Sequence, residues 1–217
     1  MNLAEVRVIA HRGNSALLPG NTMAAFRSAV TLGAHMIELD VRLSRDGVPV
    51  VVHDDRVESP TGAVEVRELT AGRLSLLGVP LLEEVLALPV AVDVEIKEPA
   101  AIPAVIDQVS QRVDVVVSSF DLDALDFLRQ LQPRLPVAYL SRERDWAAIL
   151  ERAAAARAFA LNPPRATLTP ELVDRAHGAG LRVMSYTVND PAEARQLLGW
   201  GVDAIFTDDP GRMLAIL

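Results

Sequence analysis

Short apolar runs rich in β-branched residues alternate with longer amphipathic segments along the whole sequence. This alternation predicts parallel strands joined by helices, because a parallel connection needs a crossover of about a dozen residues or more. We expect strands at residues 6–10, 36–43, 90–96, 114–118, 136–140, 158–161, 182–187 and 203–207. Helical periodicity and capping residues predict helices at residues 22–32, 101–111, 122–131, 145–156, 170–177 and 191–198. Eight strand–helix units in 217 residues favour an α/β fold of the closed (β/α)8, or TIM-barrel, type over an open doubly wound sheet.

One stretch, LSRDGVPVVVHDD, departs from the alternation. It predicts a turn around Gly47 and a return strand at 48–52, and therefore a short β-hairpin extension after the second strand. This hairpin would bring His53 back to the rim where the second strand ends. We interpret residues 54–79 as a short loop insertion. Because no Pro/Gly/Ser-rich linker divides the sequence, we expect residues 1–217 to form a single domain.

Composition excludes several classes of function. The formal net charge of −8 argues against a nucleic-acid partner, because binding to phosphates depends on basic patches. The absence of cysteine excludes disulfides, zinc–thiolate sites and thiol nucleophiles. The sequence has neither a leader-like segment nor an apolar run of membrane-spanning length, so we expect no stable membrane insertion and a cytoplasmic location. A small-molecule substrate is the expected partner, and the oligomeric state stays open.

The residues suited to chemistry stand at the carboxyl ends of the expected strands, where TIM barrels place their active sites. Strand alternation puts Glu38 and Asp40 on one face of the second strand, and Glu95 and Lys97 on one face of the third. Their apolar neighbours would face the helices, which turns the acidic side chains inward. Three inward carboxylates repel one another and are unfavourable to bury unless a cation joins them.

All-oxygen ligation favours one hard divalent cation, Mg²⁺ or Ca²⁺, over zinc or copper. The alternative is a set of structural ion pairs with the abundant arginines. Lys97 is the only lysine among 21 basic residues, which favours a specific role for it. A compact ammonium can approach one phosphate or carboxylate oxygen where a planar guanidinium needs more room.

Successive motifs run through nearly the whole chain: AHRG, P-x-N-T, IELDV, DGVPVVVHDD, VEIK, VVVSSFD, YTVND and GVDAIFTDDP. This series resembles the glycerophosphodiester phosphodiesterase family, and its specific part is the combination of His-Arg, Glu-x-Asp and His-Asp. The resemblance implies a metal-dependent (β/α)8 barrel of lipid and glycerol metabolism. Such an enzyme hydrolyses glycerophosphodiesters to glycerol 3-phosphate and an alcohol.

The resemblance also implies roles for individual residues: metal ligands Glu38, Asp40 and Glu95; catalytic acid/base pair His11 and His53; phosphate contacts Arg12 and Lys97. Tyr186 stands where the family usually has tryptophan, and is expected either to form a substrate-binding wall for glycerol or to be an ordinary rim aromatic. Phosphodiester hydrolysis needs charge neutralisation, a proton acceptor and a proton donor, which this set can supply. The sequence leaves open which histidine is the acid, and whether water or the substrate's glycerol hydroxyl attacks.

Gly20 is a departure from the family pattern, which usually reads Pro-Glu-Asn-Thr at this point. We expect the missing carboxylate to leave His11 and Arg12 less constrained. One alternative is therefore a barrel that binds phosphodiesters but has lost turnover. A second alternative is a lysophospholipase D-like enzyme, or another phosphodiesterase, on the same fold. The sequence does not identify the alcohol.

Overall fold

The computed structural model describes residues 3–60, 62–142 and 146–217. The barrel strands are β1 (Val8–His11), β2 (Met36–Leu43), β6 (Ala91–Ile96), β7 (Val115–Ser119), β8 (Val137–Leu140), β9 (Ala160–Asn162), β10 (Arg182–Ser185) and β11 (Ala204–Thr207). The remaining strands are β3 (Pro49–Val51), β4 (Arg56–Ser59) and β5 (Gly62–Glu65). The helices are α1 (Met23–Leu32), α2 (Ala71–Leu76), α3 (Leu82–Leu86), α4 (Ile102–Val109), α5 (Leu122–Leu131), α6 (Trp146–Ala155), α7 (Pro170–Gly178), α8 (Pro191–Gly199) and α9 (Pro210–Leu214). Four 3-10 turns within these ranges are Leu3–Glu5, Val66–Glu68, Pro99–Ala101 and Arg165–Thr167.

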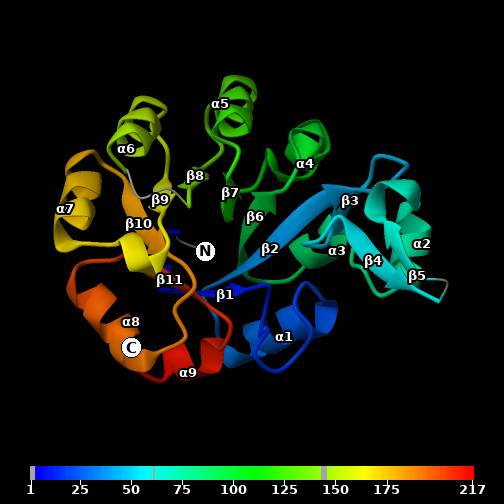
Figure 1. Cartoon of the computed structure of the whole chain (residues 1–217), viewed down its shortest axis with the longest axis horizontal. Helices are drawn as coiled ribbons and strands as arrows, with labels where there is room; N and C mark the ends of the chain where they lie inside the picture. The colour runs from blue at the N-terminus through cyan, green and yellow to red at the C-terminus, as the bar shows by residue number, and fades with distance from the viewer. Residues whose placement is uncertain (1–2, 61, 143–145) are drawn as a thin grey trace.

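Eight parallel strands of the described residues close into a barrel. They follow the order β1, β2, β6, β7, β8, β9, β10, β11, and β11 pairs with β1 to complete the ring. Figure 1 shows the ring of strands surrounded by the connecting helices. The fold is therefore the (β/α)8 barrel that the sequence predicts. No helix in the described ranges has the length and apolar character needed to span a membrane.

The expected strands all occur, with ends at most two residues from the predicted ones. β3 pairs antiparallel with the end of β2, with Val51 opposite Val41, which confirms the hairpin extension. Asp145, the first residue of the helix expected at 145–156, lies outside the described residues. The segment expected as a loop insertion at 54–79 contains the β4–β5 hairpin and α2. Its strands have only four residues each and are partly exposed, so the sequence pattern there is too short to predict them.

Two apolar layers pack against the strands, one outside the barrel and one inside it. The outer layer fills the space between strands and helices and contains Ile37, Leu39 and Val94. The inner layer fills the barrel below its carboxyl end, and its members include Leu3, Val6, Ile9, Met36, Val116, Met184 and Phe206. The inward positions nearer the carboxyl end carry polar side chains. The fold thus gathers its buried charges at one end of the barrel.

The loop after β1 docks onto α1 through Gly13. This glycine has φ +83°, and a Cβ there would lie 2.6 Å from the backbone carbonyl carbon of Ala25. The next residue, Asn14, donates its backbone N–H to the carbonyl of Ala25 at 3.0 Å. Only glycine combines this conformation with so close an approach. The docking fixes the path of the chain as it leaves His11 and Arg12.

Candidate active site

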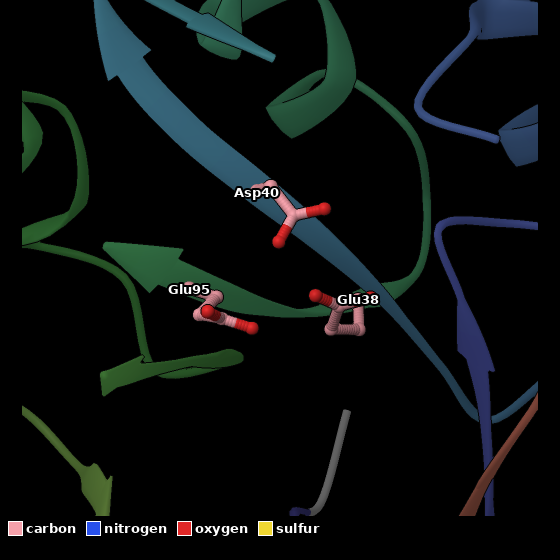
Figure 2. Close-up of side chains that lie close together, drawn as sticks. All are labelled: Glu38, Asp40 and Glu95. Atoms are coloured by element: carbon pink, nitrogen blue, oxygen red, sulfur yellow. The ribbon is translucent and has the colours of Figure 1, made fainter. Parts of the chain in front are cut away.

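Three carboxylates meet inside the carboxyl end of the barrel. Glu38 and Asp40 extend from β2, and Glu95 extends from the neighbouring β6, where it is in register with Asp40. One oxygen of each carboxylate lies within 4.8 Å of the other two, and all three residues are buried. Figure 2 shows the three side chains facing the same space from the two strands. The predicted cluster is therefore formed, and its oxygens suit a hard divalent cation.

Glu38 is the carboxylate of this cluster with the least compensation. Its Oε2 accepts a hydrogen bond from the backbone N–H of Arg12 at 2.9 Å. Its Oε1 is buried and has no partner among the described residues. Burial, followed by the negative charges of Asp40 and Glu95, raises the pKa of Glu38 well above its ordinary value. A cation at the free oxygen would relieve this unfavourable burial.

Asp40 and Glu95 share one basic partner, Lys97, and Asp40 also contacts Arg12. Lys97 Nζ lies 2.7 Å from Asp40 Oδ1 and also contacts Glu95 Oε1. Arg12 Nε lies 3.0 Å from Asp40 Oδ2. Burial opposes ionisation of Asp40, but Lys97 and Arg12 lower its pKa, whereas burial raises the pKa of Glu95. Structural ion pairs thus account for Asp40, while Glu38 has no basic side-chain partner among the described residues.

His11 is held by a carboxylate at the end of the last barrel strand. Its Nδ1 lies 2.7 Å from Asp208 Oδ1. Asp208 also accepts hydrogen bonds from Ser15 Oγ at 3.1 Å and from Asn189 Nδ2 at 2.6 Å. The hydrogen bond from His11 is the largest contribution that lowers the pKa of Asp208 to about 2. Because an ionised carboxylate can only accept hydrogen bonds, we infer that Nδ1 of His11 carries the proton in this hydrogen bond. Nε2 takes no part in it.

His53 reaches the same rim from the hairpin extension. Its Nδ1 lies 2.7 Å from Asp54 Oδ1. The side chain of Asp54 is 77% exposed, compared with 34% for Asp208. Solvent screens an exposed ion pair, so Asp54 restrains His53 less than Asp208 restrains His11.

A pocket of about 180 Å³ brings the predicted residues together. It is lined by His11, Arg12, Glu38, His53, Glu95, Lys97 and Tyr186, and Asp40 alone of the predicted set lies outside its lining. The ring of Tyr186 packs edge-to-face against Phe120 and Phe206, with centroids 6.0 Å and 6.4 Å away. Its hydroxyl donates to the carbonyl of Ser141 at 3.0 Å. Tyr186 is therefore both a wall of the pocket and an anchor for the segment after β8.

The sequence did not predict Asp208 and Asn189, the residues that hold His11 in place. Asp208 and Asn189 belong to the motifs FTDDP and YTVND, and the position of Asp208 directly after the last strand was the available signal. The effect of Gly20 on His11 and Arg12 stays a prediction, and each of these residues has a carboxylate partner elsewhere in the chain. Asp208 holds His11, and Asp40 holds Arg12.

Two histidines and two basic side chains thus line a pocket with a carboxylate cluster, at the end of a (β/α)8 barrel where enzymes of this fold have their active sites. Residues 11–212 match the model of the glycerophosphoryl diester phosphodiesterase family, and the chain belongs to this family of phosphoric diester hydrolases. It is 30% identical to the glycerophosphodiester phosphodiesterase of Caldanaerobacter subterraneus subsp. tengcongensis, over 97% of each chain.

Solved structures of phosphodiesterases also match this chain over nearly its whole length. The glycerophosphodiester phosphodiesterase of Thermotoga maritima is 31% identical, with a TM-score of 0.88 over 98% of each chain. An Oleispira antarctica phosphodiesterase, solved in complex with the product sn-glycerol-3-phosphate, is 26% identical. It superposes with a TM-score of 0.87 over 97% of this chain and 96% of its own.

The charge balance of the cluster predicts that Glu38→Gln stabilises the metal-free protein. Because folding raises the pKa of Glu38 above its ordinary 4.5, the ionised side chain destabilises the fold increasingly as the pH rises above that value. In chelator at pH 7, we expect the variant to melt about 2–4 °C higher, the shift that ~1 kcal/mol gives in a chain of this size. Thermal unfolding followed by circular dichroism measures this, and at pH 4 the difference should disappear. A lower melting temperature at pH 7 would show that Glu38 is instead part of a stabilising ion-pair network.

Proposed function

We propose that this pocket hydrolyses glycerophosphodiesters to glycerol 3-phosphate and an alcohol, with one divalent cation, Mg²⁺ or Ca²⁺, and a histidine acid/base pair. The observation that carries the proposal is that His11, His53 and the carboxylate cluster line one small pocket. Family membership supports the reaction, and the product bound in the Oleispira antarctica relative supports the class of substrate.

The donor set of this chain fits such a cation. Glu38, Asp40 and Glu95 would hold it, and the partnerless Oε1 of Glu38 is the clearest available ligand atom. A divalent ion bound here supplies charge neutralisation for the phosphoryl oxygens. Carboxylates alone give no selection for a softer metal, so Mg²⁺ and Ca²⁺ are the candidates.

Arg12 and Lys97 would bind the phosphate. Both side chains line the pocket, and both also contact Asp40, which lies outside the pocket lining. The guanidinium of Arg12 faces Asp40 through Nε, so its terminal nitrogens can donate to phosphate oxygens. Lys97 has three ammonium donors and directs them to Asp40 and Glu95, with capacity left for one ligand oxygen.

The histidines would carry the proton transfers. One imidazole takes the proton from the attacking oxygen as the new P–O bond forms, and the other gives a proton to the departing alcohol oxygen as the old P–O bond breaks. Both rings direct Nδ1 to a carboxylate, which leaves Nε2 of each for the substrate. The assignment of acid and base stays open, as does the choice between water and the glycerol hydroxyl as nucleophile.

The two alternatives receive less support. The pocket of about 180 Å³ accommodates a glycerol group, and the larger cavity beside it is lined mostly by charged and polar side chains, which disfavour an acyl chain. The binding-only alternative rested on Gly20 and on a missing orienting carboxylate. His11 and Arg12 each have a carboxylate partner without it.

Glycerol 3-phosphate release from a panel of glycerophosphodiesters, measured with and without chelator, tests the proposed function. We expect turnover with Mg²⁺, Mn²⁺ or Ca²⁺ and none after chelation. Activity that survives complete chelation would contradict the role of the cation. Release of lysophosphatidic acid from lysophospholipids, without release of glycerol 3-phosphate, would support the lysophospholipase D-like alternative.

His11→Ala and His53→Ala should each lower kcat by about 10²–10⁴-fold, the range typical for loss of a general acid or base. His177→Ala is the matched control, because His177 lies on α7 and contacts Asp203 away from the pocket. Steady-state kinetics on one diester measures the three variants, and circular dichroism confirms their folding. Near-normal turnover of either pocket variant would reduce that histidine to a structural role.

The two histidine–carboxylate pairs predict unequal effects. Asp208→Asn should lower kcat about 10–100-fold, because the hydrogen-bond network around the partly buried Asp208 sets the orientation of His11. Asp54→Asn should change kcat less than about threefold, since this carboxylate is mostly exposed. The comparison uses kcat at saturating diester, with KM as a check on substrate binding. Equal effects of the two substitutions would disprove the unequal restraint of the two rings.

A further inference from the structure

A second cavity continues the reaction pocket on the side of His53 and Lys97. Its volume is about 760 Å³, and it shares His53, Glu95, Lys97, Phe120 and Arg142 with the smaller pocket. We call it the side cavity. A diester has two ester substituents on one phosphate. If the glycerol occupies the smaller pocket, the other substituent has the side cavity next to it.

Arg142 lies where the two cavities join. Its guanidinium carbon is 4.7 Å from the ring centroid of Phe120, and the side chain is exposed. Among the described residues it has no carboxylate within ion-pair distance, unlike Arg12 beside Asp40. The preceding residue is fixed by the hydrogen bond from Tyr186 to the carbonyl of Ser141. The guanidinium is thus positioned by the ring of Phe120 and by the anchored residue before it, and no described residue pairs with its donors.

Four acidic residues line the side cavity: Asp54, Asp55, Glu95 and Asp121. Glu95 contacts Lys97. Asp54 contacts His53, and Asp121 accepts the backbone N–H of Ala124 as the N-cap of α5. Arg142 lies over one face of Phe120, so a quaternary ammonium group could not bind on that face.

We propose that the side cavity receives the leaving alcohol and that Arg142 selects alcohols that carry an anionic group, such as a carboxylate. A guanidinium presents paired donors that match a carboxylate, and it repels an ammonium group at the same position. The inference rests on the proposed phosphodiesterase function and adds to it the chemical class of the alcohol. Arg142 is then a specificity residue that touches the substrate beyond the scissile bond.

Two diesters that differ only in a carboxylate test the inference: sn-glycero-3-phosphoserine and sn-glycero-3-phosphoethanolamine. We expect the wild-type enzyme to hydrolyse the serine diester with about tenfold higher kcat/KM, the preference expected of one charge-assisted hydrogen-bonded pair. In Arg142→Met the ratio should fall to about one, because KM rises for the serine diester and, with the repulsion of the ammonium group removed, falls for the ethanolamine diester. Arg142→Lys should retain part of the preference.

Arg195→Met is the matched control, because Arg195 is exposed on α8 and lines neither cavity. It should keep the wild-type ratio. A wild-type preference for the ethanolamine diester would overturn the inference and indicate Asp55 as the selecting group. A ratio that Arg142→Met leaves unchanged would also overturn it. Absence of glycerol 3-phosphate release from both diesters would instead disprove the proposed function, and the inference with it.

Discussion

The structure depends on keeping three carboxylates buried within 4.8 Å of one another. Such a cluster is stable only if opposite charge and hydrogen-bond donors surround it. The chain supplies them from the loop after β1 and from the end of β6. Arg12 and Asn21 have left-handed backbone conformations, with φ +56° and +57°, which residues other than glycine seldom adopt. In these conformations Arg12 donates its backbone N–H to Glu38, and Asn21 donates its side-chain amide to Asp40. The two strained residues are thus the ones that donate hydrogen bonds to the buried carboxylates.

The same end of the barrel is asymmetric around the cluster. His11 is the last residue of the barrel strand β1 and contacts Asp208, which Ser15 and Asn189 hold in turn. His53 follows an edge hairpin and has only an exposed carboxylate as its partner. Both imidazole rings line the smaller pocket, and the larger side cavity lies next to His53, the less restrained of the two. Under the proposed function, this arrangement would place the more restrained histidine beside the reacting phosphate and the leaving alcohol beside the charged walls of the side cavity.

Sequence patterns predicted the elements that repeat and the residues that alternate on long strands. In β2, the outward Ile37, Leu39 and Val41 made the inward direction of Glu38 and Asp40 readable from a period of two. The β4–β5 hairpin was missed because its four-residue strands carry too little pattern. The partner of His11 was missed for a different reason. Asp208 is 197 residues away along the chain, and only closure of the barrel between β11 and β1 brings the two together.

The most direct test of this account is the binding of a divalent cation to the cluster itself. Isothermal titration of Mg²⁺, Ca²⁺ and Mn²⁺ into metal-free protein should show one site, and the same titration of Asp40→Asn should show an affinity at least about tenfold lower. Asp46→Asn, in the hairpin turn where Asp46 contacts Ser44 and Ala71, should bind as the wild type does. If the wild-type protein binds none of the three ions, or if Asp40→Asn binds them with unchanged affinity, the buried carboxylates are an ion-pair network and the account is contradicted.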